Sequence, residues 1–102
     1  MNLFNLFGNR PNFAEGIAQA NSTKGALLLD VRTPQEYGAG HIPGSVNLPL
    51  DRIETIKADK AQPLFVYCLS GARSSQATAY LARQGYTVTN NGGNYGYRGI
   101  LE

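Results

Sequence analysis

The single cysteine of this 102-residue chain lies in a segment whose residue types suit nucleophilic chemistry. The five residues that follow Cys68 are four uncharged ones and one cation: Leu69, Ser70, Gly71, Ala72 and Arg73. The thiolate is the reactive form of cysteine, and cations or helix N-termini nearby lower the thiol pKa. A glycine lets loop N–H groups turn inward, and an arginine offers a forked donor to an oxyanion. We therefore expect Cys68 to be the nucleophile and residues 69–73 to bind the substrate.

The neighbouring segments place Cys68 at the carboxyl end of a strand. Residues 63–68 form an apolar run that is too short for a helix and fits a strand buried on both faces. Residues 74–84 predict a helix that ends at Gly85. In open α/β sheets, ligands bind at the carboxyl ends of the strands, and a helix N-terminus attracts anions. A buried cysteine that only packs is the alternative; strand, loop, arginine and helix together favour the functional interpretation.

The rest of the chain alternates helical and strand-like segments. Asn12 starts a helix, residues 26–31 form an apolar strand, and Thr33 starts a second helix with Pro34 and Glu36 in capping positions. Further segments are predicted as a short strand (45–48), a short helix (51–56) and a strand (87–89) that precedes a Gly-rich turn. This order predicts a single α/β domain over residues 12–102, with a mainly parallel central sheet flanked by helices.

The composition argues against several classes of function. The net charge is only +2 and the basic residues are scattered, so we expect neither a nucleic-acid nor a membrane partner. One cysteine and one histidine exclude an internal disulfide and leave a zinc site short of ligands, so no metal is expected.

Residues 1–11 are expected to be an N-terminal extension. Its apolar residues are Leu3, Phe4, Leu6 and Phe7. The segment lacks a basic region and is a poor secretory signal, so we expect a cytoplasmic protein. The apolar residues could bind a partner or a second copy, or could pack or fray locally.

Four separate blocks of sequence resemble a single-domain rhodanese. They are Leu28–Tyr37 (LLDVRTPQEY), Gly40–Pro49 (GHIPGSVNLP), Val66–Ser74 (VYCLSGARS) and the pair Gly92–Gly93 followed by Tyr97. Tyr97 stands where that family usually has tryptophan. The resemblance implies a rhodanese-like fold over roughly residues 12–101.

The same resemblance implies sulfurtransferase activity without a cofactor. Cys68 would take the outer sulfur of thiosulfate or a persulfide and pass it to a thiophilic acceptor such as cyanide or a thiol. The partners would be a small-molecule sulfur donor and acceptor, with a protein thiol as another candidate acceptor. Two covalent half-reactions predict ping-pong kinetics.

Two other functions remain open at this point. Related phosphatases, and arsenate reductases, use the same kind of thiolate, but the phosphatase loop has one more residue than the four between Cys68 and Arg73. The chain could also be a sulfur-carrying or binding module for one protein partner. Many thiosulfate-active relatives carry a basic residue inside the loop, whereas here only Arg73 is left to bind an anion.

Three polar residues outside the loop are weaker candidates. Asp30 and Arg32 flank a strand end and could support the Cys68 loop from behind, although an ion pair with the next helix, such as Arg32 with Glu36, is an equally good interpretation. His41 is the only candidate imidazole base, but its turn-rich segment favours a structural hydrogen bond. Tyr95 and Tyr97 could line the pocket, yet aromatic residues near a chain end more often pack on the core.

Overall fold

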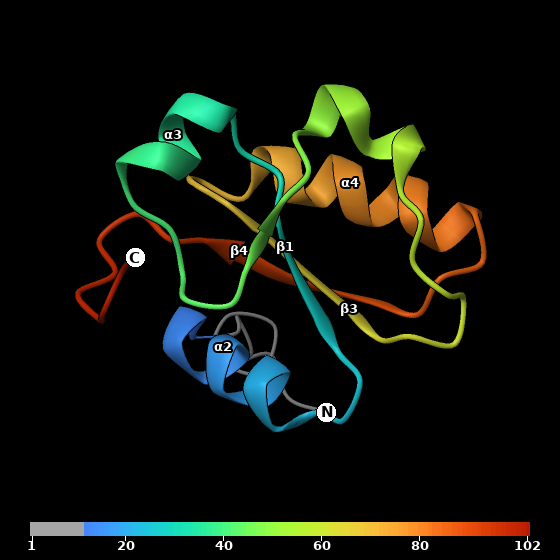
Figure 1. Cartoon of the computed structure of the whole chain (residues 1–102), viewed down its shortest axis with the longest axis horizontal. Coiled ribbons are helices and arrows are strands. Elements are labelled where there is room, and N and C mark those ends of the chain that lie inside the picture. Colours follow the sequence, from blue (N-terminus) through green and yellow to red (C-terminus); the bar gives the residue numbers. More distant parts are fainter. Residues whose placement is uncertain (1–11) are drawn as a thin grey trace, which may run out of the picture.

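The computed structural model describes residues 12–102, which form a four-stranded parallel sheet between two layers of helices (Figure 1). The strands are β1 (Leu27–Asp30), β2 (Val46–Asn47), β3 (Leu64–Cys68) and β4 (Val88–Gly93). Their order across the sheet is β2-β1-β3-β4, so β3 is central and β4 lies at one edge. The helices are α2 (Phe13–Ser22), α3 (Pro34–Ala39), the 3-10 helix η1 (Leu50–Thr55) and α4 (Ala72–Arg83).

Alternation along β3 divides the core into two halves. Successive side chains of a strand point to opposite faces of its sheet. Val66 and Cys68 therefore pack with Leu81 of α4 on one face, while Phe65 and Tyr67 pack on the α2 side. Because all five residues of β3 are buried, Cys68 ends a strand that is held firmly from both sides.

The helix starts follow the local capping signals. Asn12 accepts hydrogen bonds from the N–H groups of Ala14 and Glu15, which confirms the predicted start of α2. Thr33 and Glu36 form the complete capping box expected for α3. The short helix after residue 49 is confirmed as an element but has 3-10 geometry.

Two boundaries differ from the prediction. The helix α4 begins at Ala72, so Arg73 lies in its first turn and not in the preceding loop. The last strand continues through Gly93, where a Gly-rich turn was expected. Its pairing with β3 reaches from Leu64↔Val88 to Cys68↔Gly93 and contains an irregularity at Asn91. Asn and Gly have low strand propensity, and only the ladder with β3 keeps these residues extended.

The apolar N-terminal residues Leu3, Phe4, Leu6 and Phe7 lie outside the described residues. From residue 12 onward, no helix is long and apolar enough to span a membrane.

Candidate active site

The thiol of Cys68 lies where β3 ends and α4 begins. The Gly71 N–H donates to Cys68 Sγ at 3.0 Å, and the Ser74 N–H donates to the same atom at 3.3 Å. Gly71 is the N-cap of α4 and has a φ of 101°, a left-handed conformation that favours glycine. The sulfur is therefore held by N–H groups at the N-terminus of a 12-residue helix, where negative charge is stabilised.

This environment lowers the pKa of the Cys68 thiol below its ordinary value. Burial is the largest single influence and raises the pKa, because desolvation disfavours the thiolate. The hydrogen bonds from the N–H groups of Gly71 and Ser74 lower the pKa, and the nearby Ser74 hydroxyl and Arg73 N–H lower it further, so that together they outweigh burial. Ser74 is a contributor that the sequence analysis missed, because it placed the helix start two residues late.

The guanidinium of Arg73 points to a carboxylate on another helix. Arg73 Nη1 lies 2.6 Å from Glu36 Oε1, and Nη2 lies 3.0 Å from Glu36 Oε2. This two-pronged ion pair lowers the pKa of Glu36 to about 2, chiefly through the hydrogen bonds from Arg73. The suggested pair of Arg32 with Glu36 is therefore wrong, since Glu36 lies against Arg73.

Arg32 pairs instead with Asp30 inside the protein. Arg32 Nη2 lies 2.7 Å from Asp30 Oδ2, and the same nitrogen donates to the Gly40 carbonyl at 2.8 Å. The Arg32 guanidinium also lies 5.6 Å from the ring centre of Tyr67, the residue before Cys68. Asp30 and Arg32 thus support β3 beside the site, through one another and through Tyr67.

The residues that follow β4 form hydrogen bonds with the start of the Cys68 loop. The N–H groups of Asn94 and Tyr95 donate to the carbonyls of Cys68 and Leu69 at 2.8 and 3.0 Å. A Cβ at Gly93 would overlap the carbonyl oxygen of Leu69. Gly93 therefore lets the edge strand approach the loop closely, and this requirement comes from the tertiary structure.

The His41 ring contacts Tyr37 and Glu102. Its Nδ1 is 2.9 Å from the Tyr37 carbonyl, and its ring stacks on that of Tyr37 with 3.7 Å between centres. Its Nε2 lies 3.9 Å from a carboxylate oxygen of Glu102. These contacts agree with the structural role that the sequence favoured. Tyr97 packs against Phe13 as expected of a tail aromatic, whereas Tyr95 is 84% exposed.

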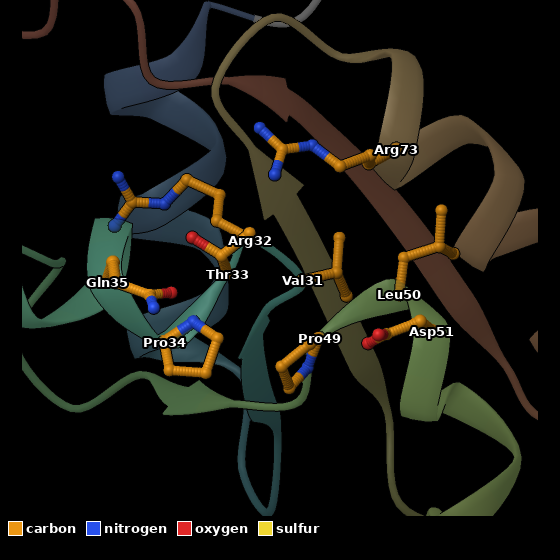
Figure 2. Close-up of a pocket in the computed structure, with 9 residues that line it drawn as sticks. All are labelled: Val31, Arg32, Thr33, Pro34, Gln35, Pro49, Leu50, Asp51 and Arg73. Atoms are coloured by element: carbon orange, nitrogen blue, oxygen red, sulfur yellow. The ribbon is translucent and has the colours of Figure 1, made fainter.

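A pocket of about 470 Å³ lies at the carboxyl ends of β1 and β2 (Figure 2). Its uncharged lining residues are Val31, Thr33, Pro34, Gln35, Pro49 and Leu50. Its charged lining residues are Arg32, Asp51 and Arg73. Three loop residues, Leu69, Ser70 and Gly71, line a separate pocket of about 600 Å³ together with Tyr95 and the end of β4. Cys68 itself is fully buried beneath the loop. Within residues 12–102, no group of three or more His, Cys, Asp or Glu side chains could hold a metal ion.

Comparison with known proteins agrees with this geometry. A sequence profile of the rhodanese-like domain matches residues 13–98, nearly all of the described chain. The chain belongs to the rhodanese-like domain family. A rhodanese-like domain protein from Staphylococcus aureus has the same fold, with a TM-score of 0.77 at 26% identity, over 90% of this chain and 94% of that one.

Two sequence relatives of this rhodanese-like domain carry activity names. A sulfurtransferase from Allochromatium vinosum is 46% identical over 66 residues, which are 63% of this chain and 62% of that protein. Thiosulfate sulfurtransferase PspE from Escherichia coli is 41% identical over 69 residues, which are 64% of this chain and 66% of that protein. The matched region thus spans slightly less than two thirds of either relative.

Proposed function

We propose that this rhodanese-like domain is a sulfurtransferase that works through a persulfide on Cys68. The observation that carries the proposal is the position of Cys68 Sγ, which accepts hydrogen bonds from Gly71 and Ser74 at the N-terminus of α4. Such donors stabilise the thiolate and would equally stabilise a negatively charged terminal sulfur. The activity names of the two sequence relatives support the same reaction class.

The reaction has two half-steps. The Cys68 thiolate attacks the outer sulfur of thiosulfate or of an organic persulfide, and a new S–S bond forms. The old S–S bond breaks, and its electron pair leaves with sulfite or with the thiolate of the donor. Cyanide or an acceptor thiol then attacks the terminal sulfur, and Cys68 regains its thiolate.

A phosphatase reaction fits this site less well. The phosphatase loop has one more residue than the four between Cys68 and Arg73, and the outer nitrogens of Arg73 are directed at Glu36. The full burial of Cys68 also favours a single terminal sulfur atom over a bulky tetrahedral group.

Intact-mass measurement tests the proposal. After incubation with thiosulfate or with 2-mercaptoethanol persulfide, the protein should gain the mass of one sulfur, and cyanide should remove it as thiocyanate. Cys68→Ser should gain nothing under the same conditions. Hydrolysis of p-nitrophenyl phosphate without any sulfur adduct would instead indicate the phosphatase. A stable adduct that cyanide cannot remove would indicate a carrier module.

A further inference from the structure

The pocket of about 600 Å³ beside the loop shares a residue with the cradle of the Cys68 sulfur. Its wall includes the loop residues Leu69, Ser70 and Gly71. Gly71 also donates its N–H to Cys68 Sγ at 3.0 Å. A molecule bound in this pocket would therefore lie next to the group that carries the transferred sulfur.

Within residues 12–102, no charged side chain lines this pocket. Its polar side chains are hydroxyls and amides, those of Ser70, Ser75, Asn90, Asn91 and Tyr95. Burying a charge without a partner costs far more free energy than burying a polar group that is hydrogen-bonded. Thiosulfate finds no charged partner here, whereas an organic thiol needs none. Of the two substrates of the proposed reaction, the thiol acceptor fits this pocket better.

Two exposed side chains offer apolar surface at this pocket. Leu69 and Tyr95 both line it, and both are exposed. The Tyr95 N–H donates to the Leu69 carbonyl at 3.0 Å, which fixes the two residues beside one another. Because the backbone of Tyr95 is held while its ring remains in solvent, the ring is available to pack on a bound molecule.

The side chain of Asn91 is buried and lacks hydrogen-bond partners. Asn91 is only 2% exposed, and neither its amide oxygen nor its amide nitrogen has a partner within the described residues. Its amide packs closely against Gly16 of α2. A buried amide without partners is destabilising, and such groups commonly pair with water or a ligand. Because Asn91 also lines the pocket, an amide on a bound molecule would supply the missing hydrogen bonds.

We propose that this pocket binds the organic body of the sulfur acceptor, an uncharged thiol that carries an amide, and that Tyr95 and Asn91 hold it there. The inference rests on the proposed persulfide reaction of Cys68. The acceptor thiol gives its proton to solvent, and its thiolate attacks the terminal sulfur of the persulfide. A new S–S bond forms in the acceptor persulfide, the S–S bond at Cys68 breaks, and its electron pair returns to Cys68 Sγ. No oxidant or reductant is required, because one S–S bond replaces another.

Discharge of the Cys68 persulfide to three acceptors tests this inference. The protein is loaded with thiosulfate or 2-mercaptoethanol persulfide and freed of the donor, and mass spectrometry then follows the loss of one sulfur at increasing acceptor concentration. N-acetylcysteamine and methyl 3-mercaptopropionate are equal in size and differ in having an amide or an ester, whereas cyanide is too small to fill the pocket. We expect N-acetylcysteamine to reach half-saturation at the lowest concentration.

Tyr95→Ala tests the aromatic contact. It should raise the half-saturating concentration of both thiols by about three- to ten-fold, and it should leave discharge to cyanide and loading by the donor unchanged. Ile100→Ala is the matched control, because Ile100 is also an exposed large side chain and does not line this pocket.

Asn91→Leu tests the amide contact, because leucine has a similar volume and no polar group. It should raise the half-saturating concentration of N-acetylcysteamine by about three- to ten-fold and leave that of the ester nearly unchanged. The melting temperature of this variant should not fall, since the amide it loses has no partner in the protein.

The possible failures are distinguishable. If no donor adds sulfur to Cys68, the proposed function itself is wrong. If sulfur is added but discharge to the thiols does not saturate, or if Tyr95→Ala slows cyanide as much as the thiols, the acceptor pocket is wrong and the sulfurtransferase stands. If the parent protein binds the amide no better than the ester, or if Asn91→Leu affects both alike, the amide preference is wrong.

Discussion

The carboxylate of Glu36, in the first turn of α3, accepts two hydrogen bonds from the guanidinium of Arg73, in the first turn of α4. The N···O distances are 2.6 and 3.0 Å. The same carboxylate accepts a hydrogen bond from the Thr33 N–H at 2.9 Å and so completes the capping box of α3. One side chain therefore stabilises a helix start and fixes the arginine beside Cys68.

Removing the charge of Glu36 should weaken the fold in a pH-dependent way. The pKa of Glu36 falls from 4.5 to about 2, mainly through Arg73. Because the folded-state pKa is the lower one, the stabilisation is complete above about pH 4.5 and disappears as the pH falls toward 2. Glu36→Gln should lower the free energy of unfolding at pH 7 by about 1 kcal/mol, since the pair is partly exposed and screened by solvent.

Urea unfolding of the parent and Glu36→Gln between pH 7 and pH 2 measures this difference. The two curves should converge at the acid end, and Glu54→Gln should follow the parent throughout. A constant gap at all pH values would mean that glutamine disturbs the α3 cap and that the ion pair contributes nothing.

The reactivity of Cys68 should depend on Ser74 and not on His41. Ser74 donates its N–H to the sulfur and its side chain helps to lower the thiol pKa, whereas His41 contacts Tyr37 and Glu102. In iodoacetamide alkylation across pH, Ser74→Ala should raise the midpoint relative to the parent, and His41→Ala should leave it unchanged.

Ser75→Ala is the control for this experiment, because Ser75 is exposed and its hydroxyl accepts a hydrogen bond from the Asn90 side chain. A parent midpoint at or above about 8.5, the value of a free thiol, would refute the lowered pKa. An upward shift in His41→Ala would assign an activating role to His41.

Gly93→Ala should disturb the catalytic loop through crowding alone. A Cβ there would overlap the Leu69 carbonyl, and Gly93 does not have a positive φ. We expect a loss of about 1–3 kcal/mol of stability, the usual cost of overpacking, together with slower alkylation of Cys68.

Gly38→Ala provides the matched substitution, since nothing lies within 4 Å of a Cβ at Gly38 and its φ is not positive. Alanine in that helix should stabilise the protein by about 0.5–1 kcal/mol. Thermal unfolding of both variants measures the contrast, and equal effects would contradict the close approach of β4 to the loop.

Breaking the buried ion pair of Asp30 and Arg32 should lower the free energy of unfolding more than breaking the partly exposed pair of Glu36 and Arg73. The side chains of Asp30 and Arg32 are 0% and 6% exposed. Arg32→Met would leave the Asp30 carboxylate without its charged partner, which typically costs about 3–5 kcal/mol. Chemical denaturation measures this loss, and a change below 1 kcal/mol would show that Asp30 finds other compensation.

Local patterns were sufficient to predict the elements around the site. The apolar run before Cys68 predicted β3, and Thr33, Pro34 and Glu36 predicted the start of α3. Such signals depend on residues a few positions apart, because capping bonds and strand alternation are local. The parallel α/β class followed from the order of these elements.

The partners of the charged groups were decided by the tertiary structure alone. Glu36 and Arg73 are 37 positions apart and meet because their helices both begin at the carboxyl ends of the parallel strands. Arg32, with Glu36 only four positions away, turns instead to Asp30 inside the protein. The extension of β4 to Gly93 likewise depends on its ladder with β3. Residue type and local spacing determined which groups could do chemistry, whereas long-range packing decided which charges are paired, because burial and strand order set the distances between them.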